Sequence, residues 1–198
     1  GEYHEWPPGP LDLAVLLKEL ETGPTHVVGI SMGGVIALQF ALDYPELVKK
    51  LVLVNTFAVL RPAHWTGYFY FLQRFILVNT MGLPAQARFV ARRIFPAPDQ
   101  ETLRQLLIEQ VTKADPRAYR AAMLNLGLFN VVRRLGEVKA PTLVITGQND
   151  TTVDPQRQKV LVNNIAGARQ VIIPGAGHAV SIDQPELFNQ ALLEFLLS

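Results

Sequence analysis

Residues 25–34 read Thr-His-Val-Val-Gly-Ile-Ser-Met-Gly-Gly, and this stretch decides the fold. An apolar, β-branched run ends at Ile30, and a helical pattern begins after Ser31. Glycines stand two positions before and after Ser31, in the pattern G-x-S-x-G, where they let a strand and a helix approach without side-chain clashes. The stretch therefore predicts a strand, a sharp turn that exposes a serine hydroxyl, and a helix. The simpler alternative is a glycine-rich turn whose serine only caps the helix.

The segments around this turn extend it into a parallel α/β pattern. A strand, a helix and a second strand follow one another closely, as in a βαβ unit, which predicts parallel pairing and a sheet covered on both faces. The same rhythm resumes after Pro141. The predicted strands are 25–31, 50–55, 142–146 and 170–173, and the predicted helices are 11–21, 32–43, 155–165 and 185–197.

The middle of the chain follows a different pattern. Strand signals are absent from residues 57–136, and Pro and Gly divide this region into helical stretches at about 63–79, 84–95, 98–114 and 117–131. We therefore predict an α/β core formed by residues 1–56 and 137–198, interrupted by an all-helical insertion at 57–136. The aromatic run at 65–71 is interpreted as packing of the insertion onto the core, or else as an apolar wall over a binding pocket.

The composition excludes several functions. The 198 residues are 49% hydrophobic and 18% charged, with no cysteine and a net charge of +1. This excludes a disordered chain, a disulfide scaffold, a thiolate zinc site and thiol catalysis. The near-neutral net charge shows no excess of basic residues of the kind that binds nucleic acid or an anionic membrane.

One uncharged segment is long enough to cross a bilayer, but it is not predicted to do so. Residues 22–42 carry no charge, yet Gly23-Pro24 and Gly33-Gly34 interrupt them. We expect no membrane span. Because the beginning of the chain lacks the basic and apolar pattern of a signal peptide, we expect a cytoplasmic protein.

A serine nucleophile needs a base, and the base needs a carboxylate to orient it. His178 lies in a loop directly after the strand at 170–173, and Asp150 lies in a loop directly after the strand at 142–146. Parallel sheets gather their sites at this edge, which makes these two residues the candidates. The other histidines lack such a context: His26 is expected in the core, and neither His4 nor His64 has a supporting motif.

Three other positions compete for the role of the acid. Asp154 precedes Pro155 and suits the N-cap of a helix, and Asp183 is expected to begin the last helix. Asn55 occupies the end of the strand at 50–55, but an amide cannot act as an ionised orienting group. The sequence therefore favours Asp150.

These motifs resemble the α/β-hydrolase fold, in its single-domain esterase, lactonase and haloperoxidase-like branch with a helical cap. Residues 25–34 resemble the nucleophile strand and elbow, residues 141–150 the acid-bearing strand, and Gly177-His178 with 183–186 the histidine loop and last helix. The resemblance covers nearly all of the chain outside the insertion. It implies a parallel-sheet fold with an inserted helical cap, the chain order Ser, Asp, His, and neither a metal nor a cofactor.

The same resemblance implies roles for the candidate residues. His178 takes the proton of Ser31 as its oxygen attacks a carbonyl carbon, while Asp150 holds the imidazole in place. The backbone N–H of Met32 supplies one half of the oxyanion hole. The second donor should come from a loop after an earlier strand, which often carries a His-Gly pair.

The chain departs from the family before Ser31. Only 30 residues precede this serine, no His-Gly pair occurs anywhere, and no strand is predicted before residue 25. We therefore expect an N-terminally truncated version of a longer enzyme, consistent with a first residue, Gly1, that is not methionine. Otherwise a homodimer or a second chain is expected to cover the exposed edge of the sheet.

The leading functional hypothesis is a serine hydrolase of a carboxylic ester, lactone or thioester, whose small-molecule substrate has a largely apolar acyl part. A carbon–carbon bond hydrolase with the same triad is the second hypothesis. The arginines of the insertion would bind a substrate carboxylate in that case, or else form a solvated helix face; these are Arg74, Arg88, Arg92 and Arg93. The third hypothesis is a ligand-binding or inactive relative.

Overall fold

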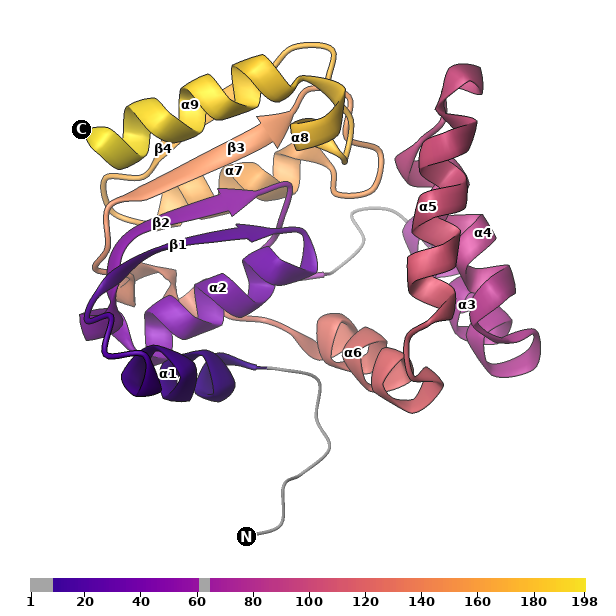
Figure 1. Ribbon diagram of the computed structural model, residues 1–198, viewed down its shortest axis with the longest axis horizontal. Coiled ribbons are helices and arrows are strands. Elements are labelled where there is room, and N and C mark those ends of the chain that lie inside the picture. The colour runs from indigo at the N-terminus through magenta and orange to yellow at the C-terminus, as the bar shows by residue number, and fades with distance from the viewer. Residues whose placement is uncertain (1–8, 61–64) are drawn as a thin grey trace, which may run out of the picture. The chain divides into compact units, whose positions relative to one another are not determined.

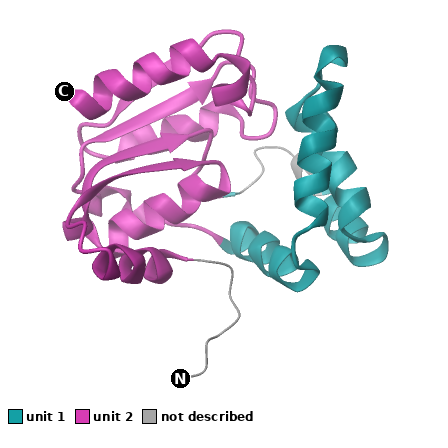
Figure 2. Ribbon diagram, in the orientation of Figure 1, with its two compact units in different colours: residues 1–7, 60–128 teal, residues 8–59, 129–198 magenta. Residues whose placement is uncertain are grey.

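The computed structural model describes residues 9–60 and 65–198. The chain divides into two compact units, each with its own packing (Figure 2). One unit is formed by residues 8–59 together with 129–198, and it contains the sheet. The other unit is formed by residues 60–128 and is helical where it is described.

The first unit is built on a four-stranded parallel sheet (Figure 1). Its order is β1-β2-β3-β4, and each strand pairs in parallel with the next. The strands are β1 (Thr25–Ile30), β2 (Val48–Val54), β3 (Thr142–Gly147) and β4 (Arg169–Ile173). The four predicted strands are confirmed, and the predicted parallel α/β architecture with them. All carboxyl ends of these parallel strands meet at one edge, where the site is expected.

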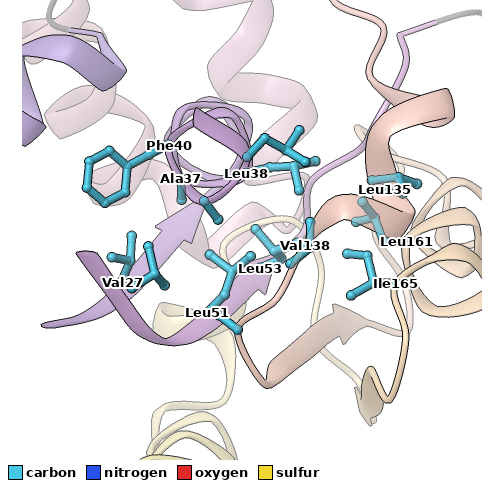
Figure 3. Packing of buried hydrophobic residues seen from close by; sticks show 14 of the residues in the cluster. Val27, Ala37, Leu38, Phe40, Leu51, Leu53, Leu135, Val138, Leu161 and Ile165 are labelled. Atoms are coloured by element: carbon cyan, nitrogen blue, oxygen red, sulfur yellow. The ribbon is translucent and has the colours of Figure 1, made fainter. Parts of the chain in front are cut away.

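Helices cover the two faces of this sheet unequally. One face packs against α1 (Pro10–Glu19), α2 (Met32–Asp43) and α7 (Pro155–Asn164), with the 3₁₀ helices η1 (Pro45–Leu47) and η3 (Val132–Glu137) nearby. In Figure 3, Leu38 of α2, Leu53 of β2 and Leu161 of α7 meet in this core. The opposite face packs against α8 (Val180–Asp183) and α9 (Pro185–Leu197). The short helix α8 was not predicted.

The face of β1 that points away from α2 is open. Val27 is buried, whereas His26, Val28 and Ile30 alternate with it and are exposed, Val28 by 42% and Ile30 by 40%. The cause is that the core beneath α8 and α9 takes its strand residues from β2, β3 and β4, and none from β1. The prediction that His26 lies in the core was therefore wrong.

The helical unit contains four α-helices in the part that the structure describes: α3 (Trp65–Thr80), α4 (Gly82–Ile94), α5 (Glu101–Thr112) and α6 (Pro116–Leu128), with the 3₁₀ helix η2 (Pro98–Gln100). Gln86 of α4 is fully buried, and with its amide oxygen facing Arg74 it accepts a hydrogen bond from Arg74 Nε at 2.7 Å. Arg88 and Arg92 are exposed. Arg74 thus belongs to the packing of this unit rather than to a solvated face.

The aromatic run at the start of the insertion lies within α3. Phe69 is exposed, and the side chains of Trp65, Tyr68, Tyr70 and Phe71 lie outside the described residues, as do His4 and His64. Among the described residues, no helix combines the length and hydropathy that a membrane span requires.

A matched pair of isoleucines tests the packing of the sheet. Ile145 of β3 is fully buried, whereas Ile172 of β4 is 52% exposed. We expect Ile145→Ala to lower the free energy of unfolding by about 2–5 kcal/mol, because it leaves a cavity in the core. Ile172→Ala should cost about 1 kcal/mol or less. Urea denaturation followed by circular dichroism measures both, and equal losses would contradict the described packing.

Candidate active site

Ser31 occupies a strained turn between β1 and α2. Its backbone angles are φ 53° and ψ −116°, in a region that residues with a β-carbon rarely adopt. The turn is held from the neighbouring strand, because Ser31 N donates to Val54 O at 2.9 Å and Thr56 Oγ1 donates to Ser31 O at 2.8 Å. Ser31 stands at the N-cap position of α2, but its side chain makes no cap hydrogen bond. The simpler alternative, a capping serine, is therefore not what the structure shows.

The glycines around Ser31 contribute unequally to this turn. A β-carbon at Gly29 would lie 2.7 Å from the Cα atom of Gly34 and closer still to the carbonyl of Gly33, and a β-carbon at Gly34 would lie 2.6 Å from Cβ of Thr56. A β-carbon at Gly33 would meet nothing within 4 Å. The close approach predicted for both glycines of the G-x-S-x-G pattern is thus required at Gly29 but not at Gly33. Gly34, outside the pattern, is the second close approach.

The structure brings Ser31, His178 and Asp150 into one hydrogen-bonded line within the sheet-containing unit. Ser31 Oγ and His178 Nε2 are 2.9 Å apart, and His178 Nδ1 and Asp150 Oδ2 are 2.8 Å apart. Both distances are those of good hydrogen bonds. His178 is 7% exposed and Asp150 is 4% exposed, so the imidazole and the carboxylate meet largely out of water.

The carboxylate of Asp150 is fixed from its other side. Its Oδ1 atom accepts hydrogen bonds from the backbone N–H groups of Thr152 and Val153, at 2.8 and 2.9 Å. The two oxygens therefore have separate partners, with the backbone on one side and His178 on the other. Such an arrangement holds the carboxylate in a single orientation toward Nδ1.

The competing acids have other partners. Asp154 caps α7 as predicted, accepting a hydrogen bond from Gln156 N at 2.8 Å. Asp183 does not begin the last helix, because α9 starts at Pro185 after an N-cap at Gln184. Instead Asp183 ends α8, and its Oδ2 atom accepts a hydrogen bond from Gly177 N at 2.8 Å, one residue before His178. That prediction was wrong because α8 lies between the histidine loop and the last helix.

The helix α2 begins directly after Ser31. Met32 is the first residue of α2, and the N–H groups of Gly34 and Val35 both donate to Ser31 O. The first N–H groups of a helix have no partner within the helix and favour a developing negative charge. Among the described residues, no three His, Asp or Glu side chains form a group that could hold a metal ion.

Comparison with known proteins places the chain in a family. Residues 12–185 match the family described as serine aminopeptidase, S33. The chain belongs to this α/β-hydrolase family. It is also 31% identical to a protein of Variovorax paradoxus described as a carbamate hydrolase, RutD, over 93% of this chain and 70% of that protein.

Two further similarities are informative. A 2-hydroxy-6-oxononadienedioate/2-hydroxy-6-oxononatrienedioate hydrolase of Comamonas testosteroni is 29% identical, over 86% of this chain and 62% of that protein. The crystal structure of a hydrolase from Pseudomonas aeruginosa PA01 superposes with a TM-score of 0.85 at 26% identity, covering 97% of this chain and 74% of that one. The chain thus belongs to a family of hydrolases, and the names of the Variovorax and Comamonas relatives give chemically different substrates.

The elbow glycines provide a direct test of the turn. We expect Gly29→Ala to lower the free energy of unfolding by about 1–3 kcal/mol, because its β-carbon would push β1 away from the start of α2. Gly33→Ala, the matched control, should change it by about 0.5 kcal/mol or less. Thermal melts of both variants measure the difference. A tolerated Gly29→Ala would contradict the close approach of strand and helix.

Proposed function

We propose that this chain is a serine hydrolase that cleaves a carboxylic ester, lactone or thioester through an acyl-enzyme. The observation that carries the proposal is the hydrogen-bonded line from Ser31 Oγ through His178 to Asp150. A serine is a weak nucleophile unless an adjacent base takes its proton, and these contacts supply both the base and the group that orients it. Family membership and the relatives that hydrolyse carbonyl compounds support the same class of reaction.

The proposed reaction runs in two halves at the same atoms. As Ser31 Oγ attacks the carbonyl carbon, its proton passes to His178 Nε2, and Asp150 stabilises the resulting imidazolium through Nδ1. The imidazolium then protonates the leaving alcohol, thiol or ring oxygen, and an acyl group stays on Ser31. Water attacks this ester with the same base and releases the acid. The N–H of Met32 is the proposed donor to the oxyanion in both halves.

An apolar cavity within the helical unit supports the apolar character of the substrate. The cavity has a volume of about 590 Å³ and lies between α3 and α6. Its lining is largely aliphatic and aromatic, with Leu72, Phe75, Val78, Met123, Leu124 and Leu128 among its residues. Apolar hollows of this size are typical of small-molecule sites. We therefore propose the insertion, residues 57–136, as the cap that selects the acyl part.

A carbon–carbon bond hydrolase is the second candidate. The relative from Comamonas testosteroni favours it, because its substrate name describes a 6-oxo dienoic acid, and hydrolysis at a ketone breaks a carbon–carbon bond. Arg74 does not favour it, since its guanidinium is engaged with Gln86 and Tyr119 in the packing of the helical unit. A panel of p-nitrophenyl esters, γ- and δ-lactones, thioesters and a 2-hydroxy-6-oxodienoate separates the two candidates. Turnover of the dienoate alone would replace the ester proposal.

Covalent labelling tests the nucleophile without knowledge of the substrate. A fluorophosphonate should add once to the wild-type protein, and intact-mass spectrometry measures the adduct. Ser31→Ala should give no adduct, because no other residue of the proposed triad is a hydroxyl nucleophile. A folded wild-type protein that fails to react would favour a ligand-binding or inactive relative instead.

A second test compares two aspartates of the same loop region. Asp150→Asn should lower kcat on the order of 10⁴-fold, because the amide no longer holds the imidazole in the tautomer that accepts the proton of Ser31. Asp154→Asn, the matched control, changes only the cap of α7 and should leave kcat within about twofold, because Asn is as good an N-cap as Asp. Steady-state kinetics on the best ester of the panel give both values. Similar losses in the two variants would contradict the assignment of Asp150.

A further inference from the structure

Asn55, which was set aside as a candidate acid, lies between the histidine loop and the acid-bearing strand β3. It follows β2 directly, is fully buried, and has a positive φ of 46° that asparagine tolerates better than most residues. Its backbone N donates to Ile145 O of β3 at 3.0 Å. Nothing in the chemistry proposed above uses its side chain.

The amide of Asn55 joins the histidine loop to the acid-bearing strand. Nδ2 donates to Gly177 O at 3.0 Å and to His178 O at 2.8 Å, while Oδ1 accepts from Gly147 N at 2.8 Å. Gln158 Nε2 also donates to Oδ1, at 3.3 Å. Two donors and two acceptor positions are all that an amide offers, so its capacity is filled.

Only an amide of this length satisfies both the carbonyl oxygens that contact Nδ2 and the N–H groups that contact Oδ1. The two partners of Nδ2 are carbonyl oxygens, which need a donor, and both partners of Oδ1 are N–H groups, which need an acceptor. The orientation of the amide is thereby determined. A carboxylate of the same shape would set an oxygen against two carbonyl oxygens, and an alanine would leave three backbone groups without this partner.

The histidine loop depends on this contact. Residues 174–178 belong to no helix or strand, and the backbone of this loop is held by few groups. These are Asn55 on the two carbonyls, Asp183 on Gly177 N, the Oε1 atom of Gln148, which accepts from Gly175 N at 3.2 Å, and Asn149 N, which donates to Ala176 O at 2.8 Å. Because Asn55 binds the carbonyl of His178 itself, a change there shifts the imidazole relative to Ser31 and Asp150.

We infer that Asn55 is a positioning residue, which sets the distance and angle of His178 toward Ser31 and Asp150 by fixing the histidine loop to Gly147. This inference rests on the proposed function, since it assigns Asn55 to the same reaction. Asn55 acts through His178 and does not touch the reacting atoms. Gln158 supports it from α7, because its Oε1 atom also accepts from Thr146 Oγ1 at 2.9 Å.

The substitution Asn55→Asp tests this inference at nearly constant volume. Burial and the two facing carbonyl oxygens should raise the pKa of the introduced carboxyl. Its protonated form donates one hydrogen bond, and its ionised form donates none. The neighbouring titratable groups, Asp150, His178 and Asp183, are present in both proteins. The rate of fluorophosphonate labelling should therefore fall on the order of 10- to 100-fold, and the ratio of variant to wild type should fall further as the pH rises between about 6 and 9.

Two controls separate positioning from stability. Thr142→Val removes a buried hydroxyl that donates to Ala140 O at 2.9 Å, at the opposite end of β3, and should lower the melting temperature without changing the labelling rate or its pH profile. Asn55→Ser carries no ionisable group, so its labelling should be slower than wild type by a factor independent of pH. If Asn55→Asp does not fold, the rate for Asn55→Ser decides. If either folded Asn55 variant is labelled at the wild-type rate, the inference is overturned.

A readout that needs no turnover keeps this test separate from that of the proposed function. The proton on His178 Nδ1, hydrogen-bonded to Asp150, should give a low-field proton resonance in the wild-type protein. In the Asn55 variants it should be shifted or lost, and in Thr142→Val it should be unchanged. If the wild type does not label, the proposed function fails, and the resonance alone decides the role of Asn55. An unshifted resonance in both Asn55 variants refutes that role.

Discussion

At Gly147 the backbone of β3 passes so close to the carbonyl oxygen of Gly177 that no β-carbon could lie between them. The same is true where Gly29 meets the carbonyl of Gly33. The first contact brings the loop after β4 against the end of β3, and the second closes the turn after β1 against the start of α2. Ser31, Asp150 and His178 come from three such loops, so their alignment depends on backbones that touch without intervening side chains.

Beneath these contacts lies a layer of buried polar side chains. Asn55, Gln158 and Thr146 are fully buried and hydrogen-bonded to each other or to the loops above. A buried polar group is costly unless it is paired, and here each group has partners of the right type. The layer thus does what apolar packing cannot do, since hydrogen bonds fix the direction as well as the distance of each loop.

Much of this arrangement follows from local sequence. Strands and helices were predictable from periodicity, and Ser31, Asp150 and His178 from their places directly after strands. The exposure of His26 was not predictable, because it depends on where α9 lies across the sheet. Neither was the contact between Asp183 and Gly177, which requires the short helix α8. The hydrogen bonds of Asn55 join residues far apart in the chain, and no local sequence pattern around position 55 predicts them.

The place of the helical unit in the chain has a consequence for how the protein acquires its structure. Residues 60–128 separate β2 from β3, yet these strands are neighbours in the sheet. Pairing them closes a long loop, whose entropic cost opposes early formation of the sheet. Contacts within the unit, such as that between Arg74 and Tyr119, join residues that are closer in sequence than β2 and β3 are, so they cost less loop-closure entropy and can form sooner. Their early formation shortens the effective loop, so that the helical insertion assists the folding of the sheet that surrounds it in sequence.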